Sequence, residues 1–322
     1  MSIVIPTWNG KAMLAECLAS IEAQAFRRFE IVVVDDGSTD GTAEYLEESW
    51  PQAHVVRLAE NAGFCVAANA GIRESLRRQP GGCLLLLNND MTLAPDFLER
   101  LVEAARASDA AMFAPLVLFK GEPDRVYGAG DALSPGGRPE SIGFRCPLAG
   151  FRAPGRVFGV SAGAALYRAQ VFEQVGVFDE RFVAYFEDCD LAFRARLAGF
   201  GAEFVPDAVA YHIGSASIEG RTWWRTEQCC RNHALLVVKN MPAPLLMRHA
   251  PAILAERIHQ LRRVWTASRA AFGALRALGH LARTCAATWA ALPHALKERR
   301  RIQRTRTIAA ADLDALLTGD GE

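Results

Sequence analysis

The stretch that decides the fold is Glu30-Ile-Val-Val-Val-Asp-Asp-Gly-Ser-Thr-Asp-Gly41. Four apolar residues follow Glu30, and a short apolar run rich in β-branched residues predicts a buried strand. The run stops at Asp35 and Asp36, which places two carboxylates at the end of that strand. Glycine, serine and aspartate then favour a turn, and we expect the next helix to begin near Thr42.

Apolar strands alternate with helices along the first 119 residues. The other strands that we predict are Ile3-Val-Ile5, His54-Val-Val-Arg-Leu58, Cys83-Leu-Leu-Leu-Leu87 and residues 111–119. Helices are predicted for residues 12–23, from Thr42, for residues 67–72 and from Pro95. This alternation is typical of a parallel sheet with helices on both faces.

Polar clusters follow three of these strands, namely Thr7-Trp-Asn-Gly10, Asp35-Asp-Gly-Ser38 and Asn88-Asn-Asp90. Each cluster alone is typical of a turn. Ligands bind beyond the carboxyl ends of parallel strands, however, so the shared position predicts one crevice. Asp35 and Asp36 could accept hydrogen bonds from a ribose or a base edge. A dehydrogenase is excluded because no G-x-G-x-x-G follows the first strand.

Two features indicate a divalent cation. Asn88-Asn-Asp90 suits magnesium held by one carboxylate, waters and substrate phosphates, with turn chemistry as the alternative. His212 ends an apolar strand and is either a core histidine or a second metal ligand or diphosphate contact.

The stretch Tyr185-Phe-Glu-Asp-Cys-Asp-Leu191 combines three carboxylates with aromatic residues at the start of a predicted helix. Acidic residues stabilise a first helical turn, which is one explanation. A carboxylate beside apolar rings is also a candidate proton acceptor with a shifted pKa. The residues alone leave both interpretations open.

The remaining middle of the chain has weaker signals. Residues 121–159 are rich in glycine and proline, which predicts irregular hairpins and a mobile flap near the site. A strand and a short helix are expected within residues 160–175, and two strands at 203–205 and 209–213. Arg231-Asn232 is either a phosphate clamp or an ordinary helix surface.

Length and composition set broad limits. A chain of 322 residues allows one large α/β domain with an appendage. The eight cysteines form no C-x-x-C pair, which favours reduced, buried thiols in a cytosolic protein. The opening Ser2-Ile-Val-Ile-Pro6 predicts no signal peptide, and no apolar run is long enough to predict a transmembrane helix. We therefore expect a cytoplasmic location.

The C-terminal part is strongly basic. Residues 245–310 contain 13 Lys or Arg against Glu256 and Glu298, a net charge of +11 that an acidic remainder balances. Within residues 245–301, a predicted helical stretch carries arginines every seven residues, with apolar residues opposite. The arginines are Arg262, Arg269, Arg276 and Arg283, and the apolar residues are Val264, Leu275, Leu278, Cys285, Trp289 and Leu292.

Two interpretations of this basic part stay open. The pattern is typical of a helix on an anionic membrane surface, at the inner face of the cytoplasmic membrane. The alternative is a helical cap packed on the α/β domain, with its arginines in water. Nucleic acid is not expected as a partner, because the body is acidic and a binding motif is missing. A short terminal helix is predicted at residues 312–317.

Together these motifs resemble glycosyltransferase family 2, the inverting enzymes with a GT-A fold, and most closely its rhamnosyltransferase-like branch. The matching stretches are Ile3-Val-Ile-Pro-Thr-Trp-Asn-Gly10, Val33-Val-Asp-Asp-Gly-Ser-Thr-Asp-Gly-Thr42, Asn61-Ala-Gly-Phe-Cys-Val-Ala-Ala-Asn-Ala-Gly71, Leu87-Asn-Asn-Asp90, Gly176-Val-Phe-Asp-Glu180, Phe186-Glu-Asp-Cys-Asp-Leu191 and His212-Ile-Gly-Ser215. They follow the family's order over residues 1–240.

The resemblance implies a role for each matching residue. Asp188 would be the general base, supported by Glu187 or Asp190. Asp90 would bind Mg²⁺ or Mn²⁺ with His212, and Asn88 replaces the first acid of the family's D-x-D element. The residues expected at the nucleotide are Pro6, Thr7, Asn9, Asp35, Asp36, Asn61, Gly63, Asn69 and Asn89.

The resemblance also implies an architecture and a reaction. The α/β GT-A domain would cover residues 1–240, with a nucleotide-sugar half at 1–118, an acceptor half at 119–240 and a basic helical extension at 241–322. We expect inverting transfer of a sugar, with rhamnose as a candidate, from a nucleoside diphosphate to a glycan or lipid-linked glycan. The rival hypotheses are transfer to polyprenyl phosphate and a non-catalytic nucleotide-sugar-binding subunit.

Overall fold

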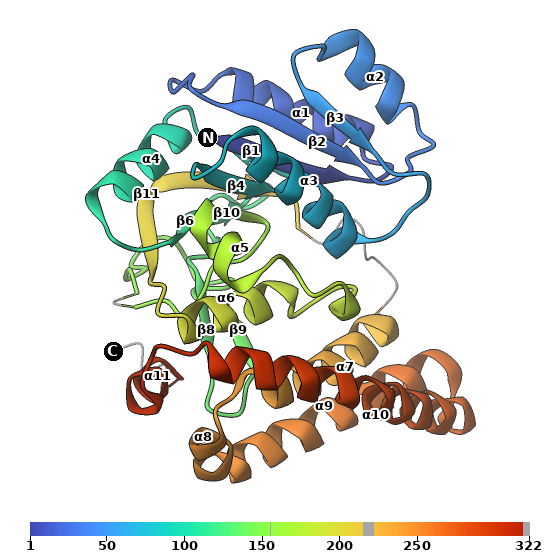
Figure 1. Cartoon of the computed structure of the whole chain (residues 1–322). Coiled ribbons are helices and arrows are strands. Elements are labelled where there is room, and N and C mark those ends of the chain that lie inside the picture. The colour runs from blue at the N-terminus through green and yellow to red at the C-terminus, as the bar shows by residue number, and fades with distance from the viewer. Residues whose placement is uncertain (155, 215–221, 318–322) are drawn as a thin grey trace.

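The centre of the molecule is a nine-stranded sheet. The computed structural model describes residues 1–154, 156–214 and 222–317 (Figure 1). Eight strands follow the order β3-β2-β1-β4-β10-β6-β11-β5, and β7 pairs with β6. The strands are β1 (Ser2–Thr7), β2 (Glu30–Asp35), β3 (His54–Arg57), β4 (Cys83–Leu87), β5 (Met91–Leu93), β6 (Met112–Phe119), β7 (Val126–Gly128), β10 (Ala164–Arg168) and β11 (Ala202–His212).

The half of the sheet built from β1 to β4 is parallel, as predicted. Strand β1 pairs in parallel with both β2 and β4, and β2 pairs in parallel with β3. Neighbouring residues point to opposite faces, so Ile3 and Val4 belong to different core clusters. The carboxyl ends of β1, β2 and β4 therefore lie along the same edge of the sheet.

The other half of the sheet is mixed. Strand β10 is antiparallel to both β4 and β6, while β6 and β11 are parallel. The prediction of two strands at 203–205 and 209–213 was wrong, because β11 is one strand with an irregular register between Val205 and Val209. Pro206 lies in that interruption and cannot donate a ladder hydrogen bond, which explains the break in the apolar pattern.

Helices cover both faces of the sheet. On one side the core joins α1 (Lys11–Glu22), α2 (Thr42–Ser49) and α4 (Phe97–Ala107) to the strands. The opposite side packs against α3 (Phe64–Arg78), α5 (Ala169–Val175) and α6 (Glu187–Leu197). A short helical turn, η1 (Glu180–Phe182), lies between α5 and α6. All eight cysteines are free.

The glycine-rich middle of the chain forms a separate hairpin, as predicted. It consists of β8 (Asp131–Leu133) and β9 (Pro139–Ser141), which pair antiparallel. The expected mobility of this region stays a prediction.

The C-terminal part is helical and lies at one end of the molecule (Figure 1). It contains α7 (Thr222–Asn240), α8 (Ala243–Arg248), α9 (Ala250–Phe272), α10 (Ala274–Arg304) and α11 (Ala310–Leu317). Helix α10 packs on α7, α9 and α6, so these helices form a cap on the α/β part. Because α7 contacts both regions, a domain boundary at residue 240 stays a prediction.

These helices bear on two expectations, the apolar face opposite the arginines and the predicted absence of a transmembrane helix. Val264 is fully buried, so it does not belong to an exposed apolar face. Among the described residues, none of the helices has the length and apolar character needed to span a bilayer.

Candidate active site

The turns after β1, β2 and β4 are joined by side-chain hydrogen bonds. Asn89 Nδ2 donates to Thr7 Oγ1 over 2.8 Å, which joins the turn after β4 to the end of β1. Asn9 Oδ1 accepts from the Thr39 backbone N–H over 2.8 Å, which joins the turns after β1 and β2. The three predicted polar clusters therefore do lie together.

Asp35 and Asp36 are buried and hold backbone turns. Asp36 accepts hydrogen bonds from the backbone N–H groups of Ala62 and Gly63, at 2.8 and 2.9 Å. Burial raises the pKa of Asp36, although these two donors act in the opposite direction. Asp35 accepts from the Ser38 N–H over 3.1 Å. Both acids thus shape the expected nucleotide pocket, and their contact with a nucleotide stays a prediction.

A cavity of about 440 Å³ lies beside these turns, in the size range of small-molecule sites. Five predicted site residues line it, namely Asn88, Asp90, Glu187, Asp188 and His212. The expected metal-binding residues and the expected base therefore share one cavity. The predicted nucleotide residues do not line it.

Asp90 and His212 form the polar pair of this cavity. Strand β11 pairs antiparallel with β5, and the register places His212 opposite Met91, beside Asp90. His212 Nε2 lies 3.0 Å from Asp90 Oδ2, and the Tyr127 ring packs edge-on against the imidazole with centroids 4.3 Å apart.

The side chains around Asp90 fit a divalent cation that is also coordinated by a bound substrate. Asp90 Oδ1 is buried and has no hydrogen-bond partner in the described part of the chain. The described residues contain no group of three or more His, Cys, Asp or Glu side chains suited to a metal. One carboxylate completed by substrate phosphates and waters is the arrangement that magnesium prefers. Asp90, with His212 and Asn88 beside it, could hold such an ion.

The loop before α6 has an unusual backbone. Val183, Tyr185 and Phe186 have φ values of 63°, 67° and 71°, in a region that costs non-glycine residues free energy. Asn232 holds this loop, because its Nδ2 lies 2.8–2.9 Å from three backbone carbonyl oxygens, those of Phe182, Ala184 and Tyr185. The loop is thereby fixed in the shape that starts α6.

Glu187 and Asp188 occupy the first turn of α6 and line the cavity. Burial, followed by the charge of Asp188, raises the pKa of Glu187 to about 8. Burial also raises the pKa of Asp188, although its hydrogen bond from the Cys189 N–H, at 2.7 Å, favours the charged form. Because Glu187 keeps its proton near neutral pH, Asp188 is the better candidate for a proton acceptor.

Comparison with known proteins identifies the family. The pattern of glycosyl transferase family 2 matches residues 2–176, more than half of the chain. The chain belongs to this family. This glycosyltransferase is 28% identical, over 235 residues, to the N-acetylglucosaminyl-diphospho-decaprenol L-rhamnosyltransferase of Mycobacterium tuberculosis (strain CDC 1551 / Oshkosh), covering 66% of this chain and 75% of the relative. The rhamnosyltransferase-like assignment is confirmed.

A second relative matches over a shorter segment. It is the undecaprenyl-phosphate 4-deoxy-4-formamido-L-arabinose transferase of Pseudomonas aeruginosa (strain LESB58), which is 38% identical over 112 residues, or 33% of this chain and 32% of the relative.

Solved structures confirm the GT-A fold. GalNAc-T7 with UDP, GalNAc and Mn²⁺ superposes with a TM-score of 0.61 at 17% identity, over 80% of this chain and 50% of the other. The mannosyltransferase PcManGT from Pyrobaculum calidifontis, with GDP-Man and Mn²⁺, superposes with a TM-score of 0.54 at 19% identity, over 94% and 86%.

Asn69 of the glycosyltransferase has a different role from the predicted one. Its side chain is fully buried in α3. Asn69 Nδ2 donates to the carbonyl oxygen of Phe178 over 3.0 Å and to Glu180, and Asn69 Oδ1 accepts from the Phe178 N–H over 2.9 Å. These bonds leave no group for a nucleotide, so Asn69 instead fixes the segment that leads to α6.

Asp190 is also a structural residue, which corrects its assignment to catalysis. Its side chain is fully buried, does not line the cavity and contacts Arg194, Lys239 and Asn240 at 2.8–2.9 Å. Burial opposes ionisation, but Lys239 and Arg194 outweigh it and lower the pKa of Asp190 to about 2. The network ties α6 to α7.

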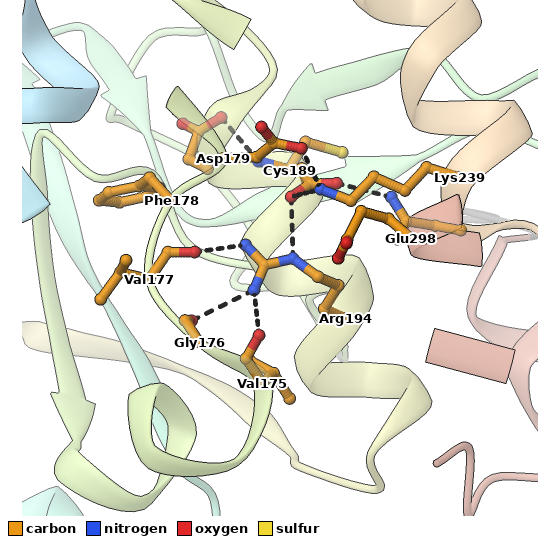
Figure 2. A network of polar contacts seen from close by, with 12 residues as sticks. Val175, Gly176, Val177, Phe178, Asp179, Cys189, Arg194, Lys239 and Glu298 are labelled. Atoms are coloured by element: carbon orange, nitrogen blue, oxygen red, sulfur yellow. Dashed lines mark hydrogen bonds and ion pairs between the residues drawn. The ribbon is translucent and has the colours of Figure 1, made fainter. Parts of the chain in front are cut away.

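Arg194 and Lys239 extend this network to the segment before α6. Figure 2 shows Arg194 donating to the carbonyl oxygens of Val175, Gly176 and Val177. Lys239 contacts Asp179 over 2.7 Å. The pair Arg231-Asn232 was predicted to be either a phosphate clamp or a helix surface, whereas Asn232 holds the loop before α6. Ser215 of the predicted His212 motif lies outside the described residues.

Asp131 lines the cavity of the glycosyltransferase and was not predicted. It begins β8, in the irregular region where a single acid has no spacing that would single it out. The pKa of Asp131 is well above its ordinary value because of burial, followed by the charge of Asp188. Its presence brings the acidic side chains of the cavity to four, the others being Asp90, Glu187 and Asp188.

Proposed function

We propose that this glycosyltransferase is a metal-dependent, inverting enzyme that moves a sugar, with rhamnose as the leading candidate, from a nucleoside diphosphate to a lipid-linked glycan. The observation that carries the proposal is the shared cavity of Asp90, His212 and Asp188. A diphosphate at Asp90 and an acceptor hydroxyl at Asp188 would both fit within its roughly 440 Å³.

Asp90 and His212 would hold the donor end. A divalent cation bound there supplies neutralisation of the charge that develops on the departing diphosphate. The free Oδ1 atom of Asp90 is the natural ligand, because its Oδ2 atom is already paired with His212. His212 thereby fixes the orientation of the carboxylate.

Asp188 would accept the proton of the attacking hydroxyl. As the acceptor oxygen bonds to the anomeric carbon, the bond from that carbon to the diphosphate oxygen breaks and its electron pair leaves with the diphosphate. The hydroxyl proton passes to Asp188, so the step is balanced without a covalent intermediate. A single displacement inverts the anomeric configuration, and a placed base typically contributes about 10²–10⁴-fold.

The relatives support the choice of substrates. The name of the mycobacterial relative specifies an L-rhamnosyl group and a diphospho-decaprenol acceptor. The relative from Pseudomonas instead favours a second candidate, transfer to undecaprenyl phosphate, through its shorter match. The process that we propose is the synthesis of bacterial surface polysaccharides, because further relatives are named for O-antigen and teichuronic acid biosynthesis.

The test is transfer by the whole chain from a panel of UDP-, GDP- and dTDP-linked sugars, with Mn²⁺ or Mg²⁺. The acceptors are N-acetylglucosamine joined by diphosphate to a short prenyl chain, and a prenyl phosphate. We expect Asp188→Asn to lose about 10²–10⁴-fold in kcat. The exposed Asp207→Asn on β11 is the matched control.

The outcomes separate the rival functions. Inverted product on the diphosphate-linked acceptor supports the proposal, whereas product on prenyl phosphate alone supports the second candidate. Equal, metal-independent turnover by the wild type and Asp188→Asn rejects the mechanism. Sugar-nucleotide binding without turnover by either protein identifies a non-catalytic binding subunit.

The C-terminal helices would hold the enzyme against anionic lipid. Most large apolar side chains that are exposed in the described part of the chain lie on them, namely Met247, Leu254, Ile258, Leu275, Leu278, Trp289 and Leu296. Leu275 and Trp289 on α10 are 85% and 73% exposed. At about 100° per residue, the four on α10 fall within roughly 60° of its circumference.

The positive charge of α9 and α10 favours an anionic membrane as the partner of their exposed apolar residues. Arg262, Arg269, Arg276 and Arg283 are exposed on the same two helices, α9 and α10. On these helices Glu256 is buried, and Glu298 pairs with Arg301 over 3.0 Å. Exposed apolar residues, together with arginines that have no acidic partner on the same helices, suit the headgroup region of an anionic bilayer.

Liposome co-sedimentation tests the membrane contact. We expect binding to vesicles with anionic lipid and little binding to neutral vesicles, and a strong loss when the four arginines become glutamine. A matched control replaces Arg27, Arg28, Arg57 and Arg77, which are exposed on the catalytic part. If both sets of substitutions weaken vesicle binding equally, the effect is one of net charge. If the substitutions on α9 and α10 leave vesicle binding unchanged, these helices do not form the membrane-binding face.

A further inference from the structure

Asp131 is an acidic side chain of the cavity that the proposed reaction does not yet use. No hydrogen bond connects its carboxylate to any described residue, although its main chain is fully engaged. The Asp131 side chain is half-buried and lines the cavity, so a molecule bound there can form a hydrogen bond with its carboxyl group.

The main chain of Asp131 is tied to the segment 157–159. Its N–H donates to the Gly159 carbonyl oxygen over 3.0 Å, and its carbonyl oxygen accepts from the Phe158 N–H over 2.7 Å. Gly130 precedes it with φ of 86°, and a side chain there would lie 2.7 Å from Val157. The start of β8 is therefore fixed against this segment.

Segment 157–159 is in turn packed on α6. A Cβ atom at Gly159 would lie 2.5 Å from the Ala192 Cβ atom, so the two backbones approach closely. Arg196 Nε donates to the Phe158 carbonyl oxygen over 2.7 Å. Ala192 lies one helical turn after Asp188, on the same side of α6. These contacts hold Asp131 close to the turn that carries Asp188.

The titratable groups that interact electrostatically with Asp131 come from three elements. Asp188 and Cys189 lie on α6, Tyr127 on β7 and Tyr167 on β10. Burial and the Asp188 charge both raise the pKa of Asp131. Two carboxyl groups in one cavity favour a state that keeps one proton. Asp131 would hold that proton, because the backbone N–H groups that donate to Asp188 favour its charged form.

We propose that Asp131 binds the acceptor: its carboxylic acid donates a hydrogen bond to a hydroxyl of the acceptor sugar and so positions the attacking oxygen at Asp188. The inference rests on the proposed transfer reaction and adds a specificity residue to its acceptor side. Asp131 keeps its proton throughout, while the proton of the attacking hydroxyl goes to Asp188.

Kinetics and direct binding test this role with the full-length protein. The acceptor probe is N-acetylglucosamine joined by diphosphate to a short prenyl chain, with the donor that the nucleotide-sugar panel selects. Asp131→Ala should raise the acceptor KM about tenfold, as expected for a lost hydrogen bond, with donor KM and donor hydrolysis unchanged. Asp131→Asn retains an N–H donor and should restore most of the affinity.

The control is Glu140→Gln on β9, in the same hairpin, where Glu140 is exposed and pairs with Arg138. Thermal unfolding verifies that all three variants fold. An acceptor KM that is unchanged in Asp131→Ala overturns the inference, as does an equal loss of donor hydrolysis.

Titration calorimetry of the acceptor probe, without donor, separates this inference from the proposed function. Weaker probe binding by Asp131→Ala than by wild type supports the inference even if no donor is turned over, in which case only the proposed reaction fails. Equal binding by both proteins, or no binding by either, counts against Asp131.

Discussion

Asn232 Nδ2 on α7 lies 2.8 Å from the backbone carbonyl oxygen of Tyr185, two residues before Glu187 and three before Asp188. The same nitrogen approaches the carbonyl oxygens of Phe182 and Ala184. One side chain from the C-terminal half of the chain therefore holds a loop with an unfavourable backbone, and that loop sets the position of the proposed base.

Asn232→Ala should lower both stability and turnover. The substitution removes the two N–H groups that Asn232 Nδ2 shares among three carbonyl oxygens, which we expect to cost about 1–3 kcal/mol of unfolding free energy. If Asp188 shifts by about 1 Å, kcat should fall up to roughly a hundredfold with the donor KM unchanged. Urea unfolding and steady-state kinetics measure the two effects. Gln228→Ala, one turn away on α7, serves as the control, and normal kcat in Asn232→Ala would contradict the positioning role.

Asp190→Asn should be strongly destabilising without touching the cavity. The substitution leaves Arg194 and Lys239 buried without their shared carboxylate, and breaking such a pair typically costs about 3–5 kcal/mol. Urea unfolding should show this loss. Asp96→Asn also removes an arginine partner at i+4, but at an exposed position just before α4, and should change stability by less than about 1 kcal/mol. Similar effects in both variants would refute the network.

His212→Gln should weaken the response to metal. The substitution removes the partner that orients Asp90, so the Mn²⁺ concentration for half-maximal transfer should rise by about 10–100-fold. Saturating Mn²⁺ should recover much of the rate. His54→Gln, which pairs with Glu74 away from the cavity, is the control. An unchanged Mn²⁺ response in His212→Gln would exclude this side chain from the metal site.

Glu187 should make stability depend on pH. The pKa of this carboxyl rises from 4.5 to about 8 on folding, so the folded state binds a proton that the unfolded chain releases. Stability from this group is therefore lost as pH rises from about 4.5 to about 8. Glu187→Gln cannot lose that proton, and its melting temperature should increasingly exceed that of the wild type across this range.

Melting curves between pH 4.5 and pH 8, recorded without metal, measure this difference. The exposed Glu48→Gln should follow the wild type at every pH. A constant offset between Glu187→Gln and wild type would mean that Glu187 titrates normally.

Local patterns in the sequence were sufficient to predict the parallel half of the sheet. Short apolar runs followed by Asp35-Asp36 and Asn88-Asn-Asp90 predicted both the strands and the edge where their turns meet, because parallel strands share one direction. The motifs with this spacing also predicted the family that residues 2–176 match. Asp90, His212 and Asp188 could be named because each belongs to a contiguous motif.

Only the tertiary structure decided what each polar side chain touches. Asn69 and Asp190 lie in the same motifs as cavity residues, yet their side chains face the core, where Asn69 holds the segment before α6 and Asp190 ties α6 to α7. Asp131 had no motif at all, and long-range packing of segment 157–159 on α6 brings it to the cavity. Sequence periodicity specifies which face of an element is apolar, but partners distant along the chain meet only when the elements pack.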